Sequence, residues 1–197
     1  MSHHTIQPGW VRITHWINAL AVVLMVMSGW QIYDASPIFP AIQFPRAITL
    51  GGWLGGALQW HFAVMWLLVG NFIVYLAANL ASGRLQRKLL PLSSQHLAAD
   101  LRALLRGRLN HDDLAHYNAI QKLAYLVVIA DLILIVLSGL AVWKSVQFPL
   151  LRTLMGGYDN ARVVHFVAMS VLVAFFAVHV AMVAIVPRSL LTMIRGR

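Results

Sequence analysis

The sequence contains no cysteine and no glutamate, and only 11% of its 197 residues are charged. Without cysteine the chain cannot form disulfides, thiolate metal sites, iron–sulfur clusters or a covalent CxxCH attachment. A soluble domain carries about 25% charged residues. The low charge, the 60% hydrophobic content and the mean hydropathy of +0.73 therefore indicate an integral membrane protein.

Acidic residues are scarce, because six aspartates oppose 15 lysines and arginines and leave a net charge of +9. A basic chain can bind nucleic acid, but here the basic residues flank apolar stretches, as membrane topology requires. We therefore expect membrane lipid and no nucleic acid as partners. The first 16 residues, MSHHTIQPGWVRITHW, lack the basic region, short apolar core and cleavage site of a secretory signal, which predicts an uncleaved membrane protein.

Four apolar stretches are long enough to cross a hydrocarbon core about 30 Å thick as helices. They cover about residues 11–33, 60–80, 123–143 and 163–186. Tryptophan and tyrosine lie near several of their ends, where interfacial anchors are expected. The sequence thus predicts an all-α membrane protein, with residues 1–197 forming a single domain built as a four-transmembrane-helix bundle.

The basic residues are unevenly divided between the two sides of the membrane. Eleven lie in the N-terminal segment, the connection between the second and third spans and the C-terminal tail, and four lie on the opposite side. The positive-inside rule then predicts that both termini are cytoplasmic and that the protein is a multi-pass protein of a bacterial inner membrane.

The connections are predicted to contain short surface helices. Residues 93–108 have leucines at helical spacing and favour an amphipathic helix on the inner leaflet, with a partner-binding helix as the alternative. Residues 148–159 favour a second short helix on the outer side. The segment 36–56 is rich in proline and glycine and is expected to lie on the outer surface.

Four of the nine histidines lie in or at the ends of spans, where ionisable side chains are costly and usually face a partner inside the bundle. His165 and His179 are fourteen residues apart, which on a helix means about 21 Å along the axis and roughly 40° around it. Because the spans alternate in direction, the four imidazoles sort into two levels. His15 and His179 share the inner level, and His61 and His165 share the outer one.

Two imidazoles facing each other across a helix bundle, with no thiolate or glutamate nearby, suit a six-coordinate b-type haem. Zinc normally takes three or four protein ligands, more than each level offers. The alternative is that these are core histidines hydrogen-bonded to Ser, Asn or carbonyl groups. Arg12 and Arg162 stand beside the two levels, where each could pair with a haem propionate or serve membrane topology alone.

Several segments together resemble one known family. They are RITHWINALAVVLMVMSGWQIYDASP in the first span, WHF in the second, HYNAIQKLAYL and SGLAVW around the third, and the fourteen-residue His–His spacing in the fourth. Over essentially its whole length the chain resembles the bacterial cytochrome b561 superfamily. It is most similar to the membrane b-type cytochrome subunits of nickel–iron hydrogenases and to the gamma subunit of respiratory formate dehydrogenase.

The resemblance implies two haem b groups, ligated by His15 with His179 and by His61 with His165. It implies electron transfer between the quinone pool and a redox partner, commonly a periplasmic subunit of the molybdopterin oxidoreductase, hydrogenase or cytochrome c type. Asn118 in YNAIQK looks like the quinone-contacting Asn of the formate dehydrogenase relative, which has a glycine where this chain has Ile120. The segment SGWQIYDASP most resembles cytochromes paired with molybdopterin oxidoreductases of the sulfite-oxidase type.

The sequence therefore favours an electron-transfer subunit of an oxidoreductase complex, with quinone as an exchangeable substrate. One alternative is a stand-alone superoxide or quinone oxidoreductase of the same fold, and another is a non-redox carrier whose histidines bind metal or protons. Each of these three functions is compatible with a homo-oligomer. Asp131, near the middle of the third span, is either a proton relay towards a quinone or a neutral, hydrogen-bonded acid inside the bundle.

Overall fold

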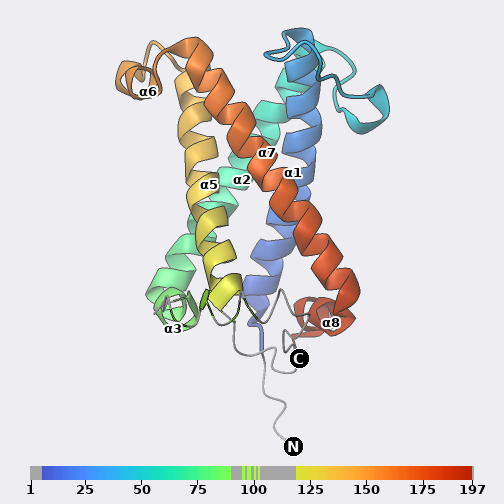
Figure 1. The fold of residues 1–197 in the computed structure, drawn as a ribbon, viewed down its shortest axis with the longest axis vertical. Helices are drawn as coiled ribbons and strands as arrows, with labels where there is room; N and C mark the ends of the chain where they lie inside the picture. Colours follow the sequence, from blue (N-terminus) through green and yellow to red (C-terminus); the bar gives the residue numbers. More distant parts are fainter. Residues whose placement is uncertain are drawn as a thin grey trace, which may run out of the picture.

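The computed structural model describes residues 6–89, 95, 97, 98, 100, 102 and 119–196 (Figure 1). Four helices in it are long and apolar enough to cross a membrane. They are α1 (Gly9–Ala35), α2 (Leu54–Ala81), α5 (Ala119–Trp143) and α7 (Tyr158–Ile185). No β-strand occurs among the described residues. The predicted all-α architecture with four spans is confirmed.

The four long helices form two pairs. α1 packs along α2 and α5 along α7, whereas the pairs make few backbone contacts with each other. α2 and α7 cross in the view of Figure 1, and both chain ends lie at the end of the bundle that carries α3 (Arg84–Leu89) and α8 (Pro187–Arg195). We call this the termini end. The opposite, loop end carries the 3₁₀ turn η1 (Arg46–Ile48) and α6 (Pro149–Leu154).

Each helix pair has a small apolar core of its own. Ala21, Val64 and Leu68 are buried between α1 and α2, and a second cluster is buried between α5 and α7. The second cluster consists of Ile135, Ala168 and Leu172. Val22 packs against both clusters. Alanine at the contact lets helix backbones approach closely, as is common in membrane bundles, so each pair forms a tight helical hairpin.

α2 begins at Leu54, six residues before the predicted start of the second span. The predicted span left the glycines before Trp60 in the surface segment, but they permit a tight turn into the helix. Gly51 has a φ of +109°, and a Cβ added to Gly56 would lie 2.3 Å from the Gly51 carbonyl oxygen. Trp53 then supplies an extended N-cap residue. The glycines therefore belong to the turn and first turn of a helix that carries His61.

The predicted surface helix at the loop end is confirmed as α6, which starts with Pro149 at a first-turn position. Of the predicted helix 93–108, the structure describes residues 95, 97, 98, 100 and 102, all helical, and the rest lies outside the described residues. α8 was not predicted. Pro187 cannot continue α7, and its fixed φ starts α8 instead.

The first and last described residues of the chain are hydrogen-bonded to each other. The Ile6 N–H donates to the Gly196 carbonyl at 2.9 Å. The Arg12 Nη1 donates to the Ile194 carbonyl at 2.7 Å, and the Trp16 Nε1 donates to the Met193 carbonyl at 3.3 Å. These donors satisfy carbonyl groups that the end of α8 leaves without intrahelical partners. The first turns of α1 are thereby fastened to the C-terminal helix.

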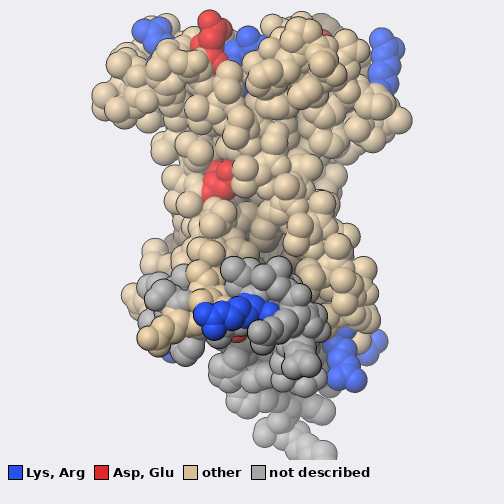
Figure 2. Space-filling model, viewed as in Figure 1, with Lys and Arg blue, Asp and Glu red and all other residues tan. Residues whose placement is uncertain are grey.

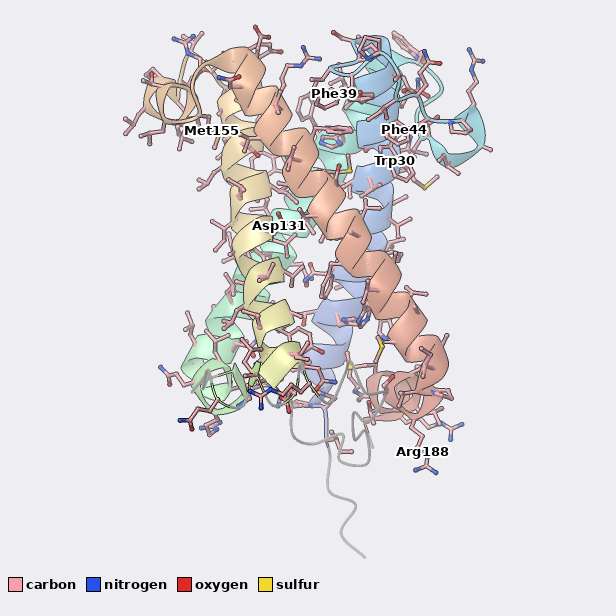
Figure 3. All side chains as sticks on the ribbon, viewed as in Figure 1. Trp30, Phe39, Phe44, Asp131, Met155 and Arg188 are labelled. Atoms are coloured by element: carbon pink, nitrogen blue, oxygen red, sulfur yellow. The ribbon has the colours of Figure 1, made fainter. Side chains whose placement is uncertain are left out.

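Charge is concentrated at the two ends of the molecule. On the face drawn in Figure 2, Lys and Arg lie at the two ends, and one acidic side chain is visible at mid-height in an otherwise uncharged middle. Figure 3 places Asp131 at mid-height on α5. It is 8% exposed, and its Oδ2 is buried with no hydrogen-bond partner among the described residues. The acid is thus inside the bundle, but this oxygen lacks the partner expected there.

Tyr33 is expected to stabilise the connection that leaves α1. Its hydroxyl donates to the Phe39 carbonyl and accepts from the Phe39 N–H, both at 3.0 Å. Tyr33→Phe leaves both partly buried backbone groups unpaired, at a cost of about 1–2 kcal/mol. For a chain of this size we expect the midpoint of thermal unfolding to fall by roughly 2–6 °C, measured by circular dichroism in detergent. The matched control is Tyr158→Phe, because Tyr158 lies exposed at the start of α7. If the midpoint of thermal unfolding falls equally in both variants, the Tyr33 hydroxyl does not stabilise this connection.

Candidate functional site

The four histidines of the spans lie in two pairs at two levels of the bundle. The rings of His15 on α1 and His179 on α7 have centroids 6.1 Å apart, and we call them the termini-end pair. The rings of His61 on α2 and His165 on α7 have centroids 6.5 Å apart, and we call them the loop-end pair. Each pair therefore takes one ring from α7 and one from the α1–α2 hairpin. These are the partners that the depth of each histidine predicted.

The spacing of the rings matches that of two imidazoles on opposite sides of one metal ion. With metal–nitrogen bonds of about 2.0 Å and a ring radius of about 1.1 Å, the two ring centres lie roughly 6 Å apart. Among the described residues no group of three or more His, Asp, Glu or Cys side chains could hold a metal ion. The donor set thus suits a planar cofactor whose metal needs only two axial ligands from the protein.

The rings of the loop-end pair contact the same dipeptide on two different helices. The Ser28 Oγ lies 3.0 Å from the His61 Nδ1, and the Ser138 Oγ lies 3.0 Å from the His165 Nδ1. Both serines are fully buried. Gly29 and Gly139 follow them, and a Cβ added at either position would lie within 3.5 Å of the neighbouring imidazole Cε1. Glycine therefore leaves space beside each ring that a larger residue would fill.

Aromatic rings surround the termini-end pair instead. Trp16 meets His15 edge to face with centroids 5.4 Å apart, and Phe175 stacks on His179 at 5.9 Å and 11°. Phe175 is one helical turn from His179, so this stacking follows from the sequence of α7 itself. Within the described part of the chain, no hydrogen bond reaches a ring nitrogen of either histidine. The two pairs thus share a spacing but differ in their supporting contacts.

The arginines predicted as propionate contacts lie at opposite ends. Besides its bond to Ile194, Arg12 has a buried Nε without a hydrogen-bond partner among the described residues. The Nη2 of Arg162 donates to the carbonyl oxygen and the Oγ of Ser36, so Arg162 ties α7 to the segment after α1. Contact with propionates stays a prediction for both. Asn118, the predicted quinone contact, lies outside the described residues.

An aromatic cluster at the loop end was not predicted from the sequence. Phe166, next to His165, stacks on Tyr33 with centroids 4.6 Å apart, and Trp30 stacks on Phe44 at the same distance. Figure 3 labels Trp30, Phe39 and Phe44 in this region. A polar cavity of about 340 Å³ lies beside the cluster, lined by Gln31, Asp34, Ala35, Gln43, Phe44 and Arg46. Phenylalanines scattered through a proline-rich loop gave no periodic signal of this cluster.

The chain is similar to known proteins over nearly its whole length. The sequence profile described as prokaryotic cytochrome b561 matches residues 6–196. A protein of Azospira oryzae that carries the name protein-methionine-sulfoxide reductase subunit YedZ1 is 63% identical over 193 residues, which are 98% of this chain and 97% of that relative. No solved structure matches the chain.

Proposed function

The chain belongs to the prokaryotic cytochrome b561 family, and from that membership we propose a di-haem b subunit that carries electrons across a bacterial inner membrane. A multi-pass membrane protein with haem b and a role in electron transfer is what the family implies. The proposal adds the number of haems, their ligands, the donor and the acceptor. The observation that carries it is the presence of two imidazole pairs, at 6.1 and 6.5 Å, on two levels of one bundle.

We propose that His15 and His179 hold one haem and that His61 and His165 hold the other. Haem held by these histidines would supply one-electron transfer at each level. α7 contributes one ligand to each site. Fourteen residues of continuous helix set the two levels about 21 Å apart along the axis. The helix thus acts as a rigid spacer between an entry site and an exit site.

The orientation of the chain follows from its basic residues. Arg12, Arg84, Arg87, Arg188 and Arg195 belong to elements at the termini end, and fewer basic residues lie at the loop end. The positive-inside rule supports a cytoplasmic termini end and a periplasmic loop end. On that orientation a quinone exchanges electrons near the termini-end pair, and Asn118 stays the residue predicted from the sequence to contact it. The loop-end pair faces the partner.

The name of the Azospira oryzae relative supports one class of partner above the others considered. That relative is named as a subunit of a protein-methionine-sulfoxide reductase. We propose that this chain delivers electrons from the quinone pool to a periplasmic reductase of that class, with hydrogenase-type and cytochrome c-type partners as less favoured alternatives. The loop end offers η1, α6 and the aromatic cluster as the surface nearest to such a partner.

The proposal predicts close to two low-spin haem b groups per chain. The measurement is a pyridine-haemochrome assay on the detergent-purified protein, with oxidised and dithionite-reduced spectra. The reduced protein should then be reoxidised by a purified periplasmic methionine sulfoxide reductase only when methionine sulfoxide is present. Absence of haem in folded protein from haem-sufficient cells contradicts the cytochrome proposal. Reoxidation by superoxide without any partner favours the stand-alone oxidoreductase instead.

A further inference from the structure

The loop-end pair is supported twice by the same local arrangement. On α1 the dipeptide Ser28-Gly29 faces His61, and on α5 the dipeptide Ser138-Gly139 faces His165. The two Oγ–Nδ1 distances are both 3.0 Å. The serines belong to different helix pairs, so this repetition does not follow from continuity of the chain. Two equal contacts on the two rings of one site indicate a shared requirement of that site.

The position of the hydroxyl hydrogens is determined by neighbouring carbonyl groups. The Ser28 Oγ lies 2.8 Å from the Leu24 carbonyl oxygen, and the Ser138 Oγ lies 2.7 Å from that of Leu134. A carbonyl can only accept, so each serine donates its single hydrogen within its own helix. The remaining lone pairs of each Oγ can then only accept. The neighbouring Nδ1 must therefore be the donor.

A second acceptor supports the same assignment. The Ile135 carbonyl oxygen lies 3.1 Å from the His165 Nδ1, and a carbonyl at that distance requires a hydrogen on the nitrogen. The His165 Nδ1 thus faces one hydroxyl oxygen, of Ser138, and one carbonyl oxygen, of Ile135. With the proton held on Nδ1, the neutral imidazole keeps its lone pair on Nε2, the nitrogen that is free to bind a metal.

We infer that Ser28 and Ser138 are positioning residues that hold His61 and His165 in the Nε2-ligating tautomer. They also make these two imidazoles more electron-rich than those of the termini-end pair. An acceptor on Nδ1–H raises the basicity of the ligating nitrogen, which favours the oxidised metal. The inference rests on the proposed function, because it assigns a role to side chains behind proposed haem ligands.

The termini-end pair provides an internal comparison. Trp16 and Phe175 contact its rings, and no oxygen acceptor on its ring nitrogens occurs in the described ranges. Removing the two serine hydroxyls should therefore change the reduction potential of one haem and leave that of the other unchanged. A general loss of packing would not change the reduction potential of one haem alone.

The test measures both midpoint potentials by spectroelectrochemical titration of the purified holoprotein, in the parent, S28A, S138A and the double variant. We expect one midpoint to rise and the other to stay constant. In the double variant the rise corresponds to about a tenfold change in the redox equilibrium constant, or about 59 mV for one electron. Each single variant should give about half of that rise. The matched control is S170A, because Ser170 makes the same bond within its helix, to the Phe166 carbonyl, but faces no histidine.

The outcomes separate the inference from the proposed function. Loss of one haem from the double variant, with the other retained, also supports the inference, because the wrong tautomer cannot bind iron through Nε2. Two unchanged midpoints, equal shifts of both midpoints or loss of both haems overturn it. If the parent protein contains no haem, the proposed function fails before any serine variant is compared.

Discussion

His165→Ala is expected to halve the haem b content of the purified protein and to leave the haem at the termini end in place. The substitution removes one proposed haem ligand of the loop-end pair, which is also the ring that faces Ser138. The other proposed ligand on the same helix, His179, lies fourteen residues away with its own partner on α1. Haem per chain, measured as the pyridine haemochrome, should therefore fall from about two to about one.

Double variants test the pairing itself. His61→Ala combined with His165→Ala should lose no more haem than either single variant, because both residues serve one site. His165→Ala combined with His179→Ala should lose both haems. The control is His96→Ala in the connection between α3 and α5, which should retain the full haem content. Loss of both haems from the single His165→Ala variant is incompatible with two separate sites.

Gly51→Ala is expected to destabilise the protein strongly, because Gly51 forms the turn that starts α2. A Cβ at this position would lie 2.3 Å from the backbone nitrogen of Ala57, and the φ of +109° is disfavoured for any residue with a side chain. Overpacking against backbone costs about 1–3 kcal/mol, and the positive φ adds about 1–2 kcal/mol. The midpoint of thermal loss of the Soret band should fall by roughly 5–15 °C.

Gly52 separates the two contributions to this effect. It also has a positive φ, +72°, but an added Cβ meets no atom within 4 Å. Gly52→Ala should therefore cost only the conformational part, and its midpoint should fall by about 2–6 °C. If the thermal midpoints of Gly51→Ala and Gly52→Ala fall by the same amount, the close approach of Gly51 to α2 has no role in stability. The haem content of Gly51→Ala should decrease first at the loop-end pair, because α2 positions His61.

The spans and the partners of the histidines could be predicted because they depend on local pattern and chain direction. Apolar stretches of about 20 residues form helices in a membrane whatever their neighbours are. Once four such helices alternate in direction, the depth of His15, His61, His165 and His179 follows from position in the sequence. Which histidines pair could therefore be predicted without knowing how the helices rotate against one another, whereas the ring distances of 6.1 and 6.5 Å could not.

Features that depend on contacts between distinct segments could not be predicted from the sequence. The hydrogen bonds of Ser28 and Ser138 to the imidazoles require the rotation and register of two helix pairs. The early start of α2 requires the contact between Gly51 and Gly56, and α8 requires donors from α1 to complete its C-terminal end. The contacts of the serines and of α8 join residues far apart in the sequence, and none of these contacts leaves a periodic signal.

The division of the bundle into two hairpins has a consequence for how the cell makes this protein. Each proposed haem site takes one histidine from α1–α2 and one from α7, and the hairpins make few backbone contacts with each other. Neither hairpin supplies both histidines of a proposed site, so bound haem would add a link to the side-chain contacts between the hairpins, such as that of Tyr33 with Phe166. When haem supply is short, newly made chains would lack these links and would be more open to membrane proteases. Haem availability would then set the amount of assembled protein after translation, without any change in gene expression.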